Sequence, residues 1–129
     1  MKQYGEERLK SMFALRSFID AGLRPTQASD YPPGPFEPMM ALQSSVTRID
    51  MNGNAWGTNQ RVTVEEAIKI GTLNGAYASF DENNKGSLEA GKLADLVVLG
   101  RNPFKEDPAT LITIPVERTM AGGKWVYES

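Results

Sequence analysis

The chain has 129 residues, enough for one domain with a real hydrophobic core. It contains no cysteine and no histidine, which excludes disulfides, Cys-ligated zinc, imidazole catalysis and Ser-His-Asp triads. Its formal net charge of −2 offers no basic field for nucleic acid, and no apolar run approaches the ~18 residues of a membrane span. We therefore expect a cytoplasmic protein that binds neither nucleic acid nor membranes.

Residues 6–21 carry the spacing of one amphipathic helix. Apolar side chains recur at helical intervals with charged residues between them, and Gly22 stands where a glycine commonly ends a helix. Residues 23–30 are expected to be extended, because their proline disfavours helix at the residue before it. The clustered prolines from 32 to 38 then predict a rigid, irregular loop, and a second helix is expected over about 37–46.

The middle of the chain combines a turn-rich loop with a clearly marked helix start. Asn-Gly and Gly-Thr-Asn sequences within 50–61 indicate turns. Thr63 and Glu66 match a capping box, in which each side chain binds the other residue's backbone N–H. The helix that they open is expected to run to about Phe80.

The end of the chain changes to strand character. Residues 93–99 read as a buried strand, and residues 116–120 and 124–127 read as two strands joined by a glycine turn. The sequence thus predicts a mixed α/β fold, with a mainly helical segment over 1–80 and a mainly β segment over 81–129.

The segment Gly86–Lys92 matches the first seven positions of a phosphate-binding P-loop. The eighth position is Leu93 rather than Ser or Thr, so the hydroxyl that binds magnesium is missing. The segment also follows a polar turn and opens a strand, whereas a P-loop follows a strand and opens a helix. We favour a tight hairpin in which Gly91 supplies the positive φ angle of a turn.

Asp30 is the candidate catalytic residue of the chain. It ends the expected extended segment, and side chains at the carboxyl ends of strands carry the chemistry of parallel α/β barrels. A helix, a short strand, a loop and a helix in this order also match the local pattern of one barrel unit. The alternative is a structural role, in which Asp30 caps a turn or the following helix.

We interpret the pairs of adjacent carboxylates and five large apolar residues as structural. Adjacent carboxylates fall at expected helix ends or in polar turns, where the helix dipole or solvent accounts for them. These pairs are Glu6-Glu7, Glu65-Glu66 and Asp81-Glu82. Large apolar residues are expected in the core or a pocket wall, since no basic groove accompanies them. They are Phe36, Met39, Met40, Trp56 and Trp125.

Three segments carry a family resemblance: 23–32 (LRPTQASDYP), 63–79 (TVEEAIKIGTLNGAYAS), and 85–99 (KGSLEAGKLADLVVL) with 120–129 (MAGGKWVYES). In this order and spacing they resemble the C-terminal part of the amidohydrolase superfamily, particularly the amidohydrolase 3 or YtcJ-like group of metal-dependent hydrolases. The resemblance spans about 8–129. It implies the last strand-helix unit of a TIM-type (β/α)8 barrel, followed by the C-terminal strands of a small β-sandwich, both incomplete in this chain.

The resemblance also implies a role for Asp30. Members of this family hydrolyse C–N bonds in amides and cyclic imide-like groups with one or two divalent metal ions, for which we expect zinc. Asp30 matches the aspartate that ends the last barrel strand, binds the metal and accepts the proton of the attacking water. The other ligands of the family, histidines with a carboxylated lysine or a glutamate, have no counterpart here, so we expect no metal or other cofactor for this chain alone.

We therefore expect a C-terminal fragment of a metal-dependent amidohydrolase that is inactive alone. Its expected partner is the remainder of the barrel or a partner chain, and exposed strand edges also favour a homo-oligomer. One alternative is a non-catalytic binding or oligomerisation module derived from such a hydrolase. An unrelated α+β domain with coincidental motifs is the other.

Overall fold

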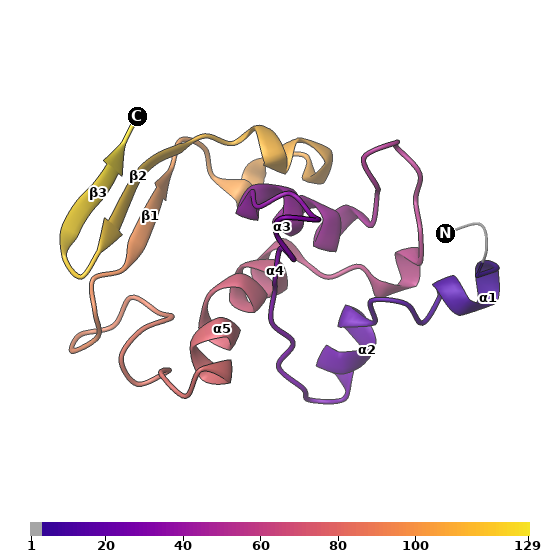
Figure 1. Cartoon of the computed structure of the whole chain (residues 1–129), viewed down its shortest axis with the longest axis horizontal. Coiled ribbons are helices and arrows are strands. Elements are labelled where there is room, and N and C mark those ends of the chain that lie inside the picture. The colour runs from indigo at the N-terminus through magenta and orange to yellow at the C-terminus, as the bar shows by residue number, and fades with distance from the viewer. Residues whose placement is uncertain (1–3) are drawn as a thin grey trace.

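The structure, a computed structural model, describes residues 4–129 and has the mixed α/β architecture that the sequence predicts. Helices form the larger part of the molecule, and a three-stranded antiparallel sheet stands at one end (Figure 1). Every helix among these residues is too short or too polar to cross a membrane. The main elements are α1 (Glu6–Leu9), α2 (Leu15–Asp20), α3 (Pro38–Thr47), α4 (Val64–Gly71), α5 (Leu73–Ala78), β1 (Leu96–Leu99), the 3₁₀ helices η2 (Pro103–Lys105) and η3 (Pro108–Thr113), β2 (Val116–Ala121) and β3 (Lys124–Glu128).

The prediction of one continuous helix over 6–21 is wrong. The chain forms α1 and α2 with a break between them, where Phe13 adopts a left-handed φ of +50°. The Arg48 guanidinium, from the end of α3, donates to the carbonyls of Met12 and Phe13 at 2.9 and 3.4 Å. These tertiary hydrogen bonds replace helical ones, and the apolar spacing of a sequence does not register them.

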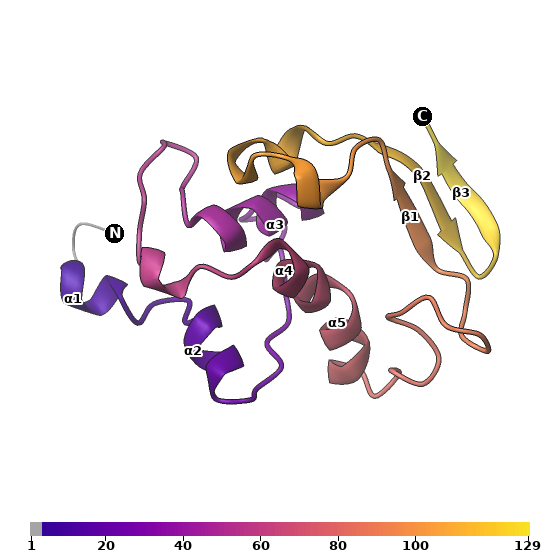
Figure 2. The same ribbon diagram turned by 180° about the vertical axis from the view of Figure 1, so that it is seen from behind.

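Gly22 ends α2 as predicted, with a φ of +76°. The N–H groups of Gly22 and Leu23 donate to the carbonyls of Ile19 and Phe18 at 2.8 and 2.9 Å, which is a Schellman motif. The chain then leaves the helix along residues 23–30, which join no strand within the described part of the chain (Figures 1 and 2).

The later helices confirm the predicted starts and correct one predicted length. α3 occupies the expected range, and the capping box is present, with the Glu66 N–H donating to Thr63 Oγ1 and the Thr63 N–H donating to the Glu66 carboxylate. The following helix does not continue unbroken to Phe80, because it breaks at Thr72 into α4 and α5. The Thr72 hydroxyl donates to the Ile68 carbonyl at 2.7 Å, a side-chain bond that commonly bends helices.

The hydrophobic core joins the helices to η3. α3 contacts both α4 and η3, and Leu111 of η3 is fully buried beside α3 residue Leu42 and α4 residue Ile70. The buried members of the core are Leu42, Val62, Ala67, Ile70, Leu111 and Ile114. The core therefore draws on residues from both the 1–80 and the 81–129 segments.

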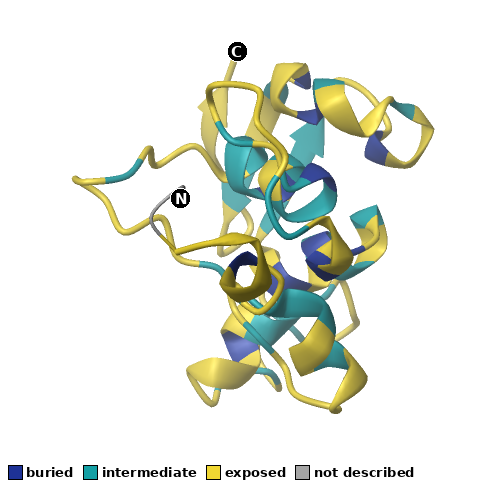
Figure 3. Cartoon of the chain, turned by 90° about the vertical axis from the view of Figure 1, so that its right-hand side faces the viewer, coloured by how far each residue is buried: buried dark blue, intermediate teal, exposed yellow. Residues whose placement is uncertain are grey.

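The sheet has the order β1-β2-β3 with antiparallel pairing throughout. The hairpin between β2 and β3 turns at Gly122 and Gly123, whose φ angles of +54° and +78° fit a type I′ turn. The last two strands lie where the sequence predicts them, whereas β1 begins at Leu96, later than the predicted residue 93. No residue in these strands is buried, and buried residues gather in the helical part (Figure 3).

Candidate functional site

Asp30 lies exposed at the end of the unpaired segment 23–30, with a left-handed φ of +54°. Within residues 4–129 no hydrogen bond or ion pair reaches its carboxylate. Its backbone carbonyl accepts the Gly34 N–H at 3.2 Å, so the backbone and not the side chain closes the following turn. The N-cap position of α3 is occupied by Glu37. The structure therefore leaves the Asp30 carboxylate without the capping role that the sequence allowed.

The start of the segment that leads to Asp30 is held by the later helix α5. The Asn74 side chain donates to the Pro25 carbonyl at 2.8 Å, and the Arg24 guanidinium lies 4.3 Å from the centre of the Tyr77 ring. The sequence does not indicate these contacts of Asn74 and Tyr77, because helical residues that contact a distant segment of the chain leave no local motif. These contacts fix the start of the segment, at Arg24 and Pro25.

The loop after Asp30 is shaped by close backbone approach. A Cβ atom on Gly34 would lie 2.4 Å from the Ser29 carbonyl oxygen, so only glycine fits there. On this loop the rings of Tyr31 and Phe36 meet edge to face at 5.8 Å. Phe36 is 65% exposed and does not line the cavity between α2 and α3, so the prediction of a place in the core of this chain is wrong. Its ring packs on another loop residue instead of on a helix.

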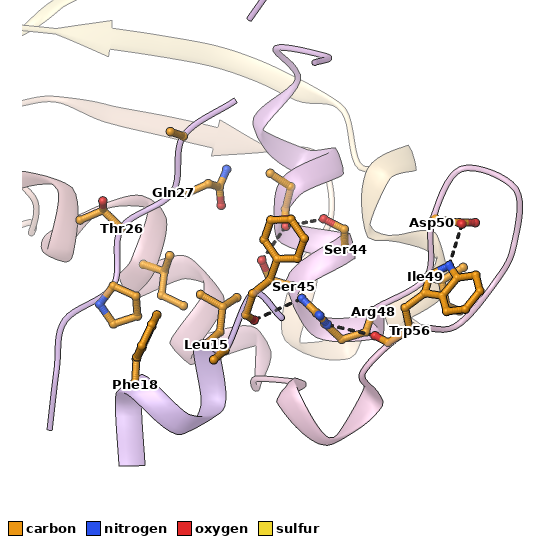
Figure 4. A pocket seen from close by; sticks show the side chains of 16 residues that line it. Leu15, Phe18, Thr26, Gln27, Ser44, Ser45, Arg48, Ile49, Asp50 and Trp56 are labelled. Atoms are coloured by element: carbon orange, nitrogen blue, oxygen red, sulfur yellow. Dashed lines mark hydrogen bonds between the residues drawn. The ribbon is translucent and has the colours of Figure 1, made fainter. Parts of the chain in front are cut away.

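A cavity of about 470 Å³ lies beside residues 25–28, between α2 and α3. In Figure 4, Leu15 and Phe18 of α2 stand on one side and Trp56 on the other. Trp56 thus takes its predicted place in a pocket wall. Apolar side chains form most of the lining, which also includes Thr26, Gln27, Ser44, Ser45, Arg48 and Asp50.

The charged groups at this cavity have structural partners. The Asp50 carboxylate accepts hydrogen bonds from Trp56 Nε1 at 2.8 Å and from the Asn54 N–H at 2.9 Å, and these bonds lower the pKa of Asp50 to about 2. Arg48 donates to backbone carbonyls, including that of Trp56 at 3.3 Å, and burial lowers its pKa. A carboxylate with so low a pKa is a poor general base near neutral pH, so Asp50 serves to close its loop.

The described residues do not form a metal site. Nowhere in residues 4–129 do three or more His, Cys, Asp or Glu side chains gather closely enough to hold an ion. A catalytic zinc site needs about three protein ligands, whereas Asp30 offers one. The chain's own residues therefore do not fit the metal that the family resemblance implies.

The adjacent carboxylates lie where the sequence predicts them, in first helical turns or directly after α5. Glu66 is the most perturbed of them, with a pKa lowered to about 2. The chief cause is a hydrogen-bonded ion pair with Arg16, and the bonds from Thr63 add to it while burial opposes it. This arrangement ties α2 to the start of α4.

The segment Gly86–Lys92 is a turn in a longer loop. Gly91 has the predicted positive φ of +94°, and the Lys92 N–H donates to the Glu89 carbonyl at 3.2 Å. The predicted hairpin is wrong, because no strand pair flanks this turn in the described structure. Strand β1 and not a helix follows, so the geometry of a P-loop is also missing.

The remaining large apolar residues divide between the core and the surface. Met39 packs against the core as predicted, and Met40 is half-buried. Trp125 is 41% exposed on β3, with the Arg118 guanidinium 5.4 Å from its ring centre, so its predicted place in the core or a pocket wall is wrong. No apolar layer among residues 4–129 covers this ring.

Comparison with known proteins gives a consistent result. Residues 1–127 match the amidohydrolase family. The chain is 39% identical over 123 residues to N-substituted formamide deformylase of Arthrobacter pascens, a match that covers 95% of this chain and 22% of that protein. It is 34% identical over 127 residues to the amidohydrolase YtcJ of Bacillus subtilis, covering 96% of this chain and 24% of that protein.

A solved structure shows the same fold over this length. An amidohydrolase from Thermotoga maritima aligns with a TM-score of 0.69 and 23% identity, covering 94% of this chain and 26% of that one. The chain thus spans about a quarter of the length of the relatives that it matches.

Proposed function

Because the chain belongs to the amidohydrolase family, we propose that it is the C-terminal part of a metal-dependent hydrolase that cleaves non-peptide C–N bonds. The observation that carries this proposal is the placement of Asp30. Its carboxylate is exposed and without a partner in the described residues, at the end of a segment whose start is held by α5. A carboxylate held in this way is available to a site that the rest of the enzyme completes.

The proposed place of residues 23–30 is the last strand of a TIM-type barrel. The backbone N–H groups of residues 26–29 have no acceptor within residues 4–129, and residues 25–28 border the apolar cavity. These residues are exposed or half-buried here, and an uncovered extended segment of this kind can pair with a neighbouring strand, which would also cover that cavity. We propose the remainder of the barrel as this partner. Strands β1 to β3 would then be the C-terminal strands of the small β-sandwich.

In the completed site, Asp30 would accept the proton of the water that attacks the carbonyl carbon. It would also supply one metal ligand, with the others coming from the remainder of the barrel. The chain alone would be inactive, since it lacks those ligands and one carboxylate does not hold a transition metal firmly.

The test compares the isolated chain with the completed enzyme, in which this chain is co-expressed with the remaining barrel. We expect zinc-dependent amide hydrolysis by the completed enzyme only, and a loss of about a thousandfold or more in kcat for Asp30→Asn. Asp20→Asn is the matched control, because Asp20 is exposed on α2 and forms only a surface ion pair with Arg16. Stoichiometric tight zinc binding or amide hydrolysis by the isolated chain would contradict the proposal.

The sheet supports a second candidate, a non-catalytic module that associates through its strands. Every residue of β3 is exposed, and an uncovered strand edge can pair with another chain. Size-exclusion chromatography with light scattering separates the two candidates. A folded, homogeneous oligomer of the isolated chain favours the module, whereas aggregation that the remaining barrel relieves favours the hydrolase part.

A further inference from the structure

The loop directly after Asp30 presents an aromatic pair to solvent. The Tyr31 ring and the Phe36 ring are 67% and 65% exposed, yet they contact each other edge to face at 5.8 Å. Aromatic side chains of this size usually bury most of their surface, and exposed apolar groups that gather at one place commonly mark a binding site. The pair is therefore a surface that lacks its partner.

This loop is also rigid and without charge. Between Asp30 and Glu37 the sequence is Tyr-Pro-Pro-Gly-Pro-Phe, which contains no charged side chain. The prolines fix their own φ angles, and Gly34 packs against the Ser29 carbonyl with no room for a side chain. A surface held in one shape loses little conformational entropy when it binds. The hydrogen bond from the Gly34 N–H to the Asp30 carbonyl keeps the start of the loop at the proposed catalytic carboxylate.

We propose that Tyr31 and Phe36 form an aromatic rim that receives a planar apolar substituent of the substrate. This inference rests on the proposed function, in which Asp30 serves the reaction and the loop after the last barrel strand borders the active site. The absence of charge between residues 31 and 36 favours an apolar substituent over a carboxylate or an ammonium group. The rim would thus determine specificity, and the chemistry would stay with Asp30 and the completed site.

The test uses the completed enzyme with two amides of the same acid, one N-methyl and one N-phenyl. We expect Phe36→Ala and Tyr31→Ala each to lower the preference for the N-phenyl amide, measured as the ratio of the two kcat/KM values, by about tenfold. The change should lie in KM for the N-phenyl amide, because the rim binds and does not react. Tyr31→Phe keeps the ring and should retain the preference. Phe104→Ala is the matched control, since Phe104 is 62% exposed on η2.

Each outcome decides the inference. If amides are hydrolysed and Asp30→Asn abolishes the activity, but the rim variants leave the preference unchanged, the inference is wrong and the proposed function stands. If the rim variants lower both kcat/KM values equally and also lower the melting temperature, the rings pack against the rest of the enzyme and the inference is again wrong. If the completed enzyme hydrolyses no amide, the proposed function fails and the inference falls with it.

Discussion

The helical part of the molecule and its sheet both carry large apolar side chains, and they bury them very differently. Around η3, Leu111 is fully buried and Ile70 of α4 is 2% exposed. On the sheet, Val97 of β1 and Val126 of β3 are 56% and 63% exposed. The helices and η3 thus supply one another's packing partners, whereas in the described residues the sheet touches this core through Leu99 at the end of β1 and leaves its other apolar side chains partly or fully exposed.

The segment 23–30 shows the same contrast within its backbone. The start of the segment contacts Asn74 and Tyr77 of α5, whereas the N–H groups of residues 26–29 have no acceptor in the described structure. A chain that spans about a quarter of its relatives therefore contains both a packed core and surfaces that nothing in the described residues covers. Substitutions in the core, in the loops and on the sheet distinguish the packed part from the uncovered surfaces.

The largest expected effect is on the core. Leu111→Ala should lower the free energy of unfolding by about 3 kcal/mol, because a fully buried leucine leaves a cavity when it is truncated. Val126→Ala on β3 should change it by less than about 0.5 kcal/mol, since that side chain is exposed. Urea unfolding followed by circular dichroism measures both. A loss for Val126→Ala as large as that for Leu111→Ala would show that the sheet is covered in solution, and the contrast would be wrong.

Two glycines in the loop between α5 and β1 should show the next largest effects on the free energy of unfolding. Gly86→Ala should cost more than about 1 kcal/mol, because its Cβ would lie 2.7 Å from the Ala76 Cβ and its φ is +92°. Gly91→Ala should cost about 1 kcal/mol, since its φ of +94° is strained for alanine but the space around it is open.

Gly75→Ala is the control for these glycine variants. It lies in α5 with nothing within 4 Å of the added Cβ, and alanine favours a helix, so stability should stay unchanged or rise. Thermal unfolding of the variants ranks them. Equal stability of Gly86→Ala and Gly91→Ala would show that the loop does not pack against α5.

Sequence reasoning succeeded where a signal and its physical cause lie close together in the chain. The capping box of Thr63 and Glu66, the helix end at Gly22 and the β2–β3 turn all act through bonds between residues a few positions apart. The positive φ of Gly91 belongs to the same class. The role of Asp30 stays a prediction, drawn from its place at the end of an expected strand and from the family resemblance. The structure adds that its carboxylate has no partner in the described residues.

The failures have causes that are distant in sequence. The break between α1 and α2 depends on Arg48, which lies more than thirty residues beyond the carbonyls that it binds. Phe36 and Trp125 were expected in the core because large apolar residues usually are, but no apolar layer of the described structure covers them. Asn74, which positions the Asp30 segment, is an ordinary helical residue in the sequence. Such contacts appear only when the elements are placed in space.

The effect of pH should fall on the helical part. Glu66 has a pKa of about 2, below its ordinary value of 4.5, because Arg16 and Thr63 bind its charged form. A carboxyl with a lowered pKa stabilises the fold fully above the unfolded value and loses this contribution as the pH falls through the folded one. Stability should therefore decline between about pH 4.5 and pH 2. Glu66→Gln should flatten this decline and cost about 1.5 kcal/mol at pH 7, because glutamine keeps the capping-box bond but loses the charge-assisted bond to Arg16.

Urea unfolding at a series of pH values checks this prediction. Glu128→Gln on β3 is the control, because the Glu128 carboxylate lies 3.7 Å from Arg118 on an exposed strand and should leave the decline as it is. If Glu66→Gln and the parent chain lose stability in parallel as the pH falls, then Glu66 is not the group that links α2 to α4.

The smallest expected effect is that of Asp30→Asn on the stability of the isolated chain. The carboxylate has no partner within residues 4–129, so the free energy of unfolding should change by less than about 0.5 kcal/mol. Asp50→Asn is the matched comparison and should lower the unfolding midpoint clearly, because Asp50 accepts hydrogen bonds from Trp56 and Asn54. A loss for Asp30→Asn equal to that for Asp50→Asn would assign Asp30 a structural role, and the carboxylate would no longer count as one kept for a completed site. If Asp30→Asn leaves the free energy of unfolding of the isolated chain unchanged but abolishes hydrolysis by the completed enzyme, then Asp30 acts only in the completed enzyme.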